Sequence, residues 1–313
     1  MIAEIERGLL GMDEIEKEYF RWKAAFRSEK CAGKSKECTD IKSARKGLTD
    51  NGLVITRADK SKHLVLMKKQ RYVEALEEYI RKTECERVGH EIVRKIDRKV
   101  KRLEKSPLAS IFSFLKGVHV MNPGVPRLFG FAKTHKTNKE ITPVVEKCKG
   151  PTYKLEKRMH SYLSELIGDH HFVTKNSIDV VKDLQELALM DNEVGSVMDF
   201  ENMYPSIKPS SCFEALMEVL YGLHPSAAAY SKDLEMMASL VCVQSFFVFK
   251  GKVKRCPAKQ LKGVPMGSPM SGLLCELMVR KMERITLINF KEDIIMYSTK
   301  GMCTMCLLYG GTT

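Results

Sequence analysis

The order of apolar patterns along the chain constrains its fold more than any other feature of the sequence. Short apolar or β-branched runs predict strands, whereas apolar residues at helical spacing predict helices. Strands are predicted at 53–56, 64–67, 197–200 and 245–249, a strand-and-loop segment at 123–150, and helices at 71–105, 152–190, 211–222, 228–241 and 271–287. Strands and helices do not alternate as they do in a doubly wound parallel sheet, so we predict an α+β fold.

The chain carries a large excess of positive charge. Its 52 Lys and Arg residues outnumber its 39 Asp and Glu residues, which gives a net charge of +13. Such a charge favours polyanionic partners, because each cation that meets a phosphate releases condensed counterions. A solvated basic surface without any partner is the alternative interpretation.

Sequence signals for membrane insertion, secretion and zinc binding are absent. No apolar stretch approaches the roughly 20 residues of a membrane span. Residues 1–20 mix acidic and apolar residues as an amphipathic helix does, unlike a signal peptide. The ten cysteines form no disulfide framework, and the Cys303/Cys306 pair has no second pair at zinc spacing. We therefore expect an intracellular protein, in the nucleus or the cytoplasm, with reduced thiols.

Asp199 stands inside the apolar run 197–200, where a carboxylate is costly to bury without a partner. A divalent metal is one such partner, because polymerases hold two metal ions on carboxylates at strand ends. A strand-end aspartate that caps the next turn is an equal alternative. Tyr204 follows at the next turn, where an aromatic ring can lie under the sugar of a nucleotide or serve as an ordinary core residue.

Residues 260–271, with the sequence QLKGVPMGSPMS, form a second block that is rich in turn-forming residues. Glycines allow close approach of the backbone to a ligand, and a helix that begins after the loop favours phosphates at its N-terminus. A glycine-rich loop is a weak signal alone, but the complete wording of this block is specific.

Both blocks resemble motifs of one enzyme family. Residues 199–207, DFENMYPSI, resemble motif A of reverse transcriptases, and residues 260–271 resemble motif B. The sequence is most similar to the reverse transcriptases of Penelope-like retroelements. Three further stretches carry that resemblance, namely ADK at 58–60, PRLFGFAKTHK at 126–136 and FFVFKG at 246–251.

The resemblance implies the fingers and palm of a right-hand polymerase, with RNA-directed DNA polymerisation that uses Mg²⁺, an RNA or DNA template-primer and dNTPs. Asp199 would be the catalytic metal ligand and Tyr204 the aromatic beside the sugar. Lys133 and Lys136 would lie in the fingers near the triphosphate or the template, although a solvated basic loop is the alternative. Gln260 and Gly263 would lie beside the nucleotide and the template.

The sequence departs from the family at two places. Thr142 occupies the position where the family has an arginine, whose fork binds phosphate in two-point fashion. The larger departure is motif C, because the family places paired aspartates where this chain reads KGMCTMC at 300–306, and Asp293 is the last acidic residue. We therefore predict a palm sheet without its motif C hairpin, a poor Mg²⁺ site and an inactive polypeptide.

These considerations give a domain prediction: an N-terminal helix and basic arm at 1–50, the N-terminal region and fingers at 51–195, a partial palm at 196–299 and an aberrant tail at 300–313. No segment resembles the family's thumb. A frameshift can explain the tail, because one encoding of KGMCTMC reads RYVHDV in another frame. The alternatives are a non-catalytic nucleic-acid-binding fragment and an unstable pseudogene product.

Overall fold

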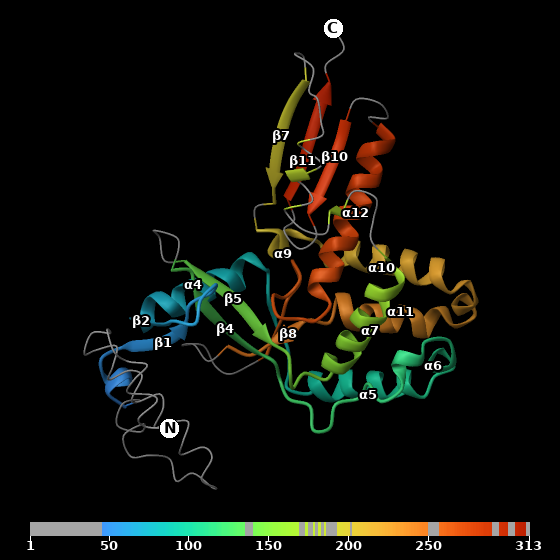
Figure 1. The fold of residues 1–313 in the computed structure, drawn as a ribbon. Helices are drawn as coiled ribbons and strands as arrows, with labels where there is room; N and C mark the ends of the chain where they lie inside the picture. The colour runs from blue at the N-terminus through green and yellow to red at the C-terminus, as the bar shows by residue number, and fades with distance from the viewer. Residues whose placement is uncertain are drawn as a thin grey trace, which may run out of the picture. The chain divides into compact units, whose positions relative to one another are not determined.

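The computed structural model describes the chain in several segments. Side chains are described for 46–134, 140–168, 200, 202–249 and 257–285 and for the single positions 178, 181, 182 and 185, and the backbone alone for 173–174, 193–199, 286–289, 294–299 and 304–310. The chain divides into two compact units, and the smaller one comprises residues 1–55 and 66–70. The larger unit contains most of the described elements and all of the candidate site (Figure 1).

The elements follow one another in a mixed order, as the α+β prediction requires. They are β1 (Leu53–Arg57), β2 (Leu64–Lys68), α4 (Lys69–Lys82), β3 (Glu86–Arg87), α5 (Ile92–Glu104), α6 (Leu108–Ile111), η1 (Ser113–Leu115), β4 (Arg127–Ala132), β5 (Ile141–Glu146), α7 (Tyr153–Leu166), β6 (Val173–Thr174), β7 (Glu193–Asp199), α9 (Met203–Ser206), α10 (Pro209–Leu223), η2 (Pro225–Tyr230), α11 (Ser231–Cys242), β8 (Phe246–Phe247), β9 (Ala258–Lys259), α12 (Ser271–Asn289), β10 (Ile294–Thr299) and β11 (Thr304–Gly310).

Most of the predicted elements form, and one predicted helix is divided in two. The predicted helix 71–105 is divided into α4 and α5, because Glu84 takes a left-handed backbone with φ 50° and β3 then pairs with β9. Over 152–190, where helices are predicted, α7 is the first helix, and Gly168 at φ +62° follows it. A glycine in the left-handed region is a common helix terminator. Much of 169–192 lies outside the described residues.

The main core is built from one face of each of several helices. In α5 the apolar side chains recur at helical spacing, and Val93, Ile96, Val100 and Leu103 are all buried. They pack in one cluster with residues of α7, α10, α11 and α12, including Met159, which is fully buried. This amphipathic spacing places the charged side chains of the same helices on the outside.

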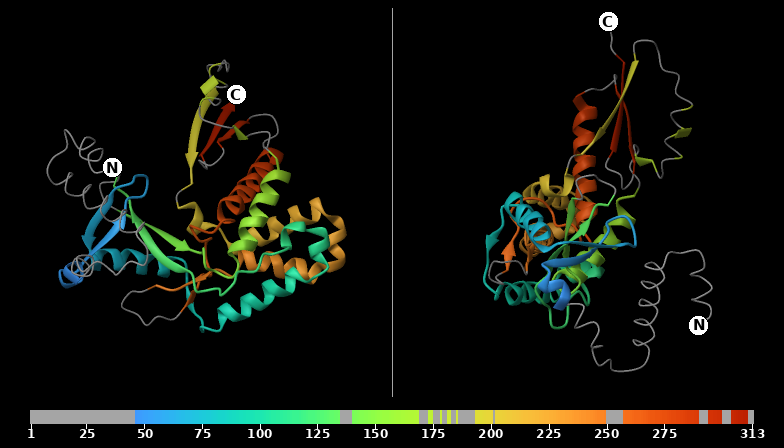
Figure 2. Two further views of the ribbon diagram at one scale, coloured as in Figure 1. Left: turned by 60° about the horizontal axis from the view of Figure 1, so that its bottom comes forward. Right: turned by 90° about the vertical axis from the view of Figure 1, so that its left-hand side faces the viewer.

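A four-stranded sheet, hereafter the Asp199 sheet, has the strand order β6–β10–β11–β7. Strand β11 is antiparallel to both of its neighbours, and β6 pairs with β10 in parallel. Helix α12 runs along this sheet in all three ribbon views (Figures 1 and 2).

The expectation that the palm sheet lacks its motif C hairpin is wrong. β10 and β11 pair with each other, and β11 also pairs with β7 along its whole length, so the described part of the segment 300–313 is a paired strand. Ile294, Ile295, Tyr297, Thr304 and Tyr309 are of types that favour strands. A backbone ladder forms between such segments whatever the intervening turn carries.

Candidate active site

Asp199 is the last residue of β7, and the backbone register fixes what stands beside it. Thr304, the first residue of β11, is its partner across the two strands. β10 ends at Thr299 and β11 begins at Thr304. Both of these residues lie at the end of the sheet where Asp199 stands, hereafter the Asp199 edge. Residues 300–303 themselves lie outside the described residues.

The donor set at this edge does not fit a two-metal site. Two Mg²⁺ ions need several oxygen ligands in near-octahedral geometry. The strand pair beside Asp199 belongs to a segment, 294–313, that contains no Asp or Glu in its sequence. Among the side chains that the structure describes, no three His, Cys, Asp or Glu residues form a group that could hold a metal ion.

The turn after β7 and the loop 260–271, hereafter the B loop, touch through their backbones. The Val264 N–H donates to the Tyr204 carbonyl at 2.8 Å. Gly263 has φ +75°, and a Cβ at this position would stand 2.6 Å from the Pro205 Cα. The close approach therefore requires glycine here. The structure thus brings Tyr204 and Gly263, two of the predicted site residues, together.

The other side of the B loop rests on β5. The Val145 N–H donates to the Met266 carbonyl at 2.7 Å. Gly267 has φ +102°, and a Cβ there would lie 2.5 Å from the Val145 carbonyl oxygen. The two glycines of the B loop therefore let one segment pack between the turn after β7 and strand β5.

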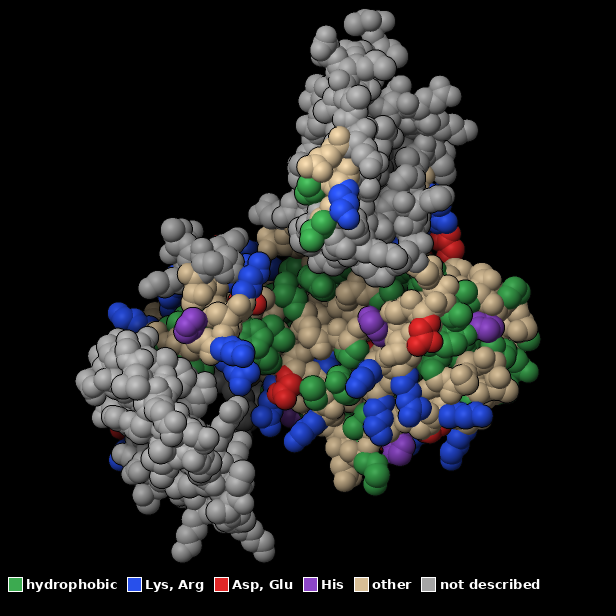
Figure 3. Space-filling model, in the orientation of Figure 1, with side chains coloured by type: hydrophobic (Ala, Val, Ile, Leu, Met, Phe, Trp, Pro, Cys, Tyr) green, Lys and Arg blue, Asp and Glu red, His purple; other side chains and the backbone are tan. Residues whose placement is uncertain are grey.

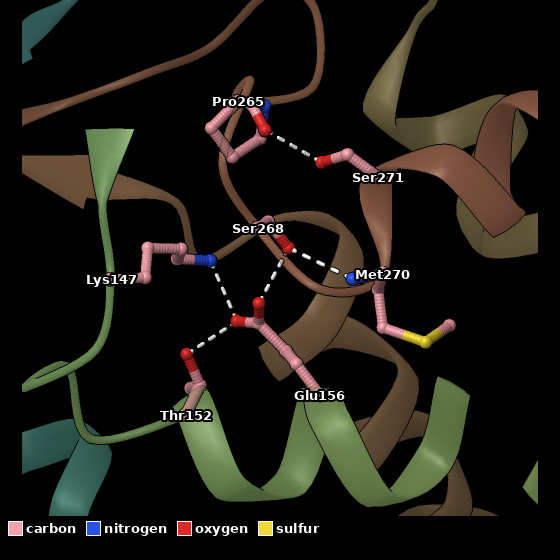
Figure 4. Close-up of polar contacts among 7 residues, drawn as sticks. All are labelled: Lys147, Thr152, Glu156, Pro265, Ser268, Met270 and Ser271. Atoms are coloured by element: carbon pink, nitrogen blue, oxygen red, sulfur yellow. Dashed lines mark hydrogen bonds and ion pairs between the residues drawn. The ribbon is translucent and has the colours of Figure 1, made fainter. Parts of the chain in front are cut away.

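A buried ion pair lies beneath the B loop in Figure 4 and contacts it through a hydrogen bond to Ser268. The Lys147 Nζ lies 2.6 Å from the Glu156 Oε1, and the two side chains are 2% and 0% exposed. The Thr152 hydroxyl donates to the same Glu156 oxygen at 2.6 Å, and the Ser268 hydroxyl donates to Oε2 at 2.5 Å. Both carboxylate oxygens of Glu156 are thus satisfied, as a buried charge requires.

Two further hydrogen bonds connect this network to the start of α12. The Ser268 hydroxyl accepts from the Met270 N–H at 3.2 Å, and the Ser271 hydroxyl donates to the Pro265 carbonyl at 2.7 Å. Glu156 thereby fixes the B loop and the first turn of the helix that follows it. We name Lys147, Thr152, Glu156 and Ser268 the Glu156 network.

Gln260 opens the B loop and is 1% exposed. The Tyr79 hydroxyl donates to its Oε1 at 3.3 Å, and its Nε2 donates to the Lys262 carbonyl at 2.9 Å. Burial raises the pKa of Tyr79 well above its usual value, so this hydroxyl stays protonated and a donor. Gln260 thus joins the B loop to α4, and nucleotide contact by its side chain stays a prediction.

One of the two predicted fingers lysines, Lys133, lies beside the β4–β5 hairpin. Lys133 follows β4 and pairs with Glu140 at 3.2 Å, with a quarter of its side chain exposed. Lys136 lies outside the described residues. The hydroxyl of Thr142, which stands in place of the family's arginine, donates to the Asp59 Oδ2 at 2.8 Å. The Asp59 N–H also donates to the Ala132 carbonyl, so the ADK turn docks on this hairpin.

Sequence reasoning missed the Glu156 network. One signal was available, because Glu156 lies on the same side of α7 as Leu155, Met159 and Leu163, which are all buried. A charged residue on an apolar helix face needs a partner. No local pattern identifies Lys147 and Ser268 as those partners.

Comparisons with known proteins find similarity in three dimensions only. Neither the protein-family models nor the curated proteins give a match. Telomerase from Candida tropicalis in complex with a fragment of telomeric RNA superposes with a TM-score of 0.52 at 12% identity, covering 85% of this chain and 44% of the telomerase. Apo telomerase truncated from its C-terminal domain gives a TM-score of 0.51 at 10% identity, with coverages of 85% and 54%.

The chain thus spans about half the length of these telomerases. At such low identity the similarity establishes the fold, and the fold is reverse-transcriptase-like with mixed helices and strands. In the described part of the chain, none of the helices is both long enough and apolar enough to cross a membrane.

Proposed function

We propose that this chain is a reverse-transcriptase domain of the Penelope-like type that binds nucleic acid but does not polymerise it. The fold supports the broad class, and the motif-like sequences at 199–207 and 260–271 support the narrower one. The net charge of +13 supports a nucleic-acid partner.

One observation carries the proposed loss of catalysis. Thr304 stands across from Asp199 on the neighbouring strand, and no carboxylate occurs in 294–313. The polymerase reaction joins a primer 3′-hydroxyl to the α-phosphate of a nucleotide, and metal ions stabilise the attacking and leaving oxygens. A single aspartate at this edge provides too few oxygen ligands for two such ions.

The remaining parts of the site keep a positioning role in this proposal. The B loop, with Gly263 against Pro205 and Gly267 against Val145, offers a fixed surface beside the turn that carries Tyr204. Lys133 lies within reach of solvent beside the β4–β5 hairpin, where it can meet a phosphate as a mobile point charge.

Metal binding tests the proposal directly. We expect the unmodified chain to bind Mn²⁺ weakly, as followed by the paramagnetic resonance signal of free Mn²⁺. The double variant Thr304→Asp/Met305→Asp places carboxylates on β11 at and next to the partner position of Asp199, and we expect it to tighten binding at least about tenfold. Adding Asp199→Ala to it should reverse the gain. Tight binding by the unmodified chain would contradict the proposal.

The nucleotide sequence tests the origin of the tail. We expect the nucleotide sequence over codons 300–305 to encode RYVxD in another reading frame. In this string one residue separates arginine-tyrosine-valine from the aspartate. Its absence would refute the frameshift hypothesis while leaving the proposed binding role untouched.

A further inference from the structure

We propose that a groove between α5 and α11, apart from the Asp199 edge, binds the backbone of single-stranded RNA. The inference rests on the proposed function for the class of partner, because it assumes that the chain meets nucleic acid. It adds a surface that the active-site motifs do not include.

The groove has a volume of about 440 Å³ and is open to solvent. One wall consists of the α5 side chains Lys95, Arg98, Lys99 and Arg102, which are all exposed. Ile92 of α5 and Met236 of α11, both half-buried, give the groove an apolar part. A basic wall beside an apolar strip suits a chain that carries phosphates on one side and flat base faces on the other.

Helix α5 carries many more positive than negative charges. Between Ile92 and Glu104 the sequence IVRKIDRKVKRLE contains six cations and two carboxylates, and the buried face takes the apolar residues. Asp97 is engaged by Lys101 at 2.7 Å, and Asp233 of α11 by Arg102 at 3.2 Å. Within the described residues, no ion pair involves Arg98 or Lys99, so their charges face solvent.

Figure 3 shows the basic side chains on one face of the molecule. Lys and Arg side chains gather along the lower edge of this face, where Figure 1 places α5 and α6. Acidic side chains are sparse among them in this view. Such a concentration of one sign of charge attracts a polyanion before any contact is made.

The dimensions favour a single strand over a duplex. From Lys95 to Arg102 the helix rises roughly 10 Å, so the basic wall can contact only a few phosphates of one strand. A volume near 440 Å³ is that of a small-ligand site and takes individual bases rather than a double helix. Acidic peptides are negatively charged as RNA is, but their acidic side chains have no flat base that could lie on the apolar part of the groove.

RNA is favoured over DNA by the polar end of the groove. Gln244, just beyond the end of α11, lines the groove and is half-buried. Its side-chain amide offers both a donor and an acceptor, and the 2′-hydroxyl of RNA can use either. DNA lacks this group.

The test is the salt dependence of binding to a fluorescent 12-nucleotide oligouridine, followed by anisotropy between 50 and 300 mM KCl. The variant Lys95→Gln/Arg98→Gln/Lys99→Gln removes three exposed charges from the groove. Each lost phosphate contact lowers the slope of log K against log salt by about 0.7 for a single strand. We expect the slope to fall by about 2 and the affinity at 100 mM KCl to fall at least tenfold.

The matched control is Lys149→Gln/Lys154→Gln/Lys157→Gln, which removes three exposed lysines that do not line the groove. We expect it to change the affinity less than threefold. Equal losses in the two triple variants would show that net charge alone matters and would overturn the groove. Thermal unfolding of both variants verifies that they fold.

The remaining outcomes separate this inference from the proposed function. If the unmodified chain does not bind oligouridine at 50 mM KCl, the proposed nucleic-acid binding fails and the groove with it. If the chain binds and the groove variant binds equally well, the groove alone fails. An oligodeoxyuridine of the same length that binds as tightly as the RNA would overturn the assignment to RNA. Displacement of the oligouridine by a polyglutamate with the same number of negative charges would also overturn it.

Discussion

The B loop and the Asp199 sheet are held in place by different kinds of interaction. Side chains and special backbone angles fix the B loop, through Gly263, Gly267 and the Glu156 network. Hydrogen bonds between backbones define the Asp199 sheet, with β11 paired to β7 from Thr304 to Gly310. Backbone ladders need no particular side chain at the turn, whereas a buried carboxylate needs specific partners.

This difference shows how a strand pairing can form without particular side chains at the strand ends. The strand pair beside Asp199 forms from residues that favour strands, even though the tail carries no carboxylate. The B loop has less freedom, because Gly263, Gly267 and Ser268 each make a contact that depends on the residue type. We therefore expect mutations in the B loop region to affect stability strongly and mutations at the sheet edge to affect it little.

The largest effect is expected at Glu156. Glu156→Gln leaves the Lys147 charge buried without its partner, which costs about 3–5 kcal/mol of unfolding free energy in comparable buried pairs. Urea unfolding measures this loss. The surface pair of Glu78 and Lys82 provides the control, and Glu78→Gln should leave the urea midpoint unchanged.

A second variant keeps this prediction open to refutation. Replacing both partners, as Lys147→Met/Glu156→Leu, removes the two charges together and should recover much of the lost stability. A double variant as unstable as Glu156→Gln would mean that Ser268 and Thr152, rather than the ion pair, determine the effect.

Gly263→Ala should have the next largest effect. The new Cβ would meet the Pro205 Cα at 2.6 Å, at a backbone φ of +75°. Overpacking and backbone strain of this kind together cost about 3 kcal/mol. Gly272→Ala is the matched control, since nothing lies within 4 Å of a Cβ there. Similar urea midpoints for the two variants would contradict the close contact between the B loop and the turn after β7.

Alkaline pH should weaken the core behind the B loop by a smaller amount. Burial raises the pKa of the Cys212 thiol to about 12 from an ordinary value of 9.0. The stability that this thiol contributes is complete below pH 9 and is lost as the pH rises toward 12, because the unfolded chain ionises first. At pH 10 the loss is about 1.4 kcal/mol.

Unfolding free energies measured between pH 8 and pH 10.5 follow this loss. Burial also raises the pKa of the Cys242 thiol, with Cys212 and Glu156 adding to the shift, so both thiols contribute. Cys212→Ala should show a shallower decline than the unmodified chain. Identical slopes for the two proteins would contradict the buried thiol.

The smallest effect on stability is expected at the sheet edge. Thr304→Asp changes a residue whose described role is backbone pairing with Asp199. We expect its urea midpoint to stay close to that of the unmodified chain, in contrast to Gly263→Ala. A loss as large as that of Gly263→Ala would show that the side chain at this position matters to the fold.

The sequence predicted the elements that depend on local patterns. The strand that ends in Asp199 and the helix α12 follow from apolar spacing, and the B loop follows from its glycines and prolines. The partners of Glu156 could not be predicted, because Lys147 and Ser268 are joined only by the tertiary fold. The β10–β11 hairpin differs from the prediction because strands form from backbone pairing and do not require the paired aspartates.

Primer extension on the purified chain tests the central claim most directly. With a template-primer, dNTPs and either Mg²⁺ or Mn²⁺, we expect no incorporation above that of an Asp199→Ala control, because the strand beside Asp199 supplies no second carboxylate. Metal-dependent incorporation that Asp199→Ala abolishes would contradict this claim.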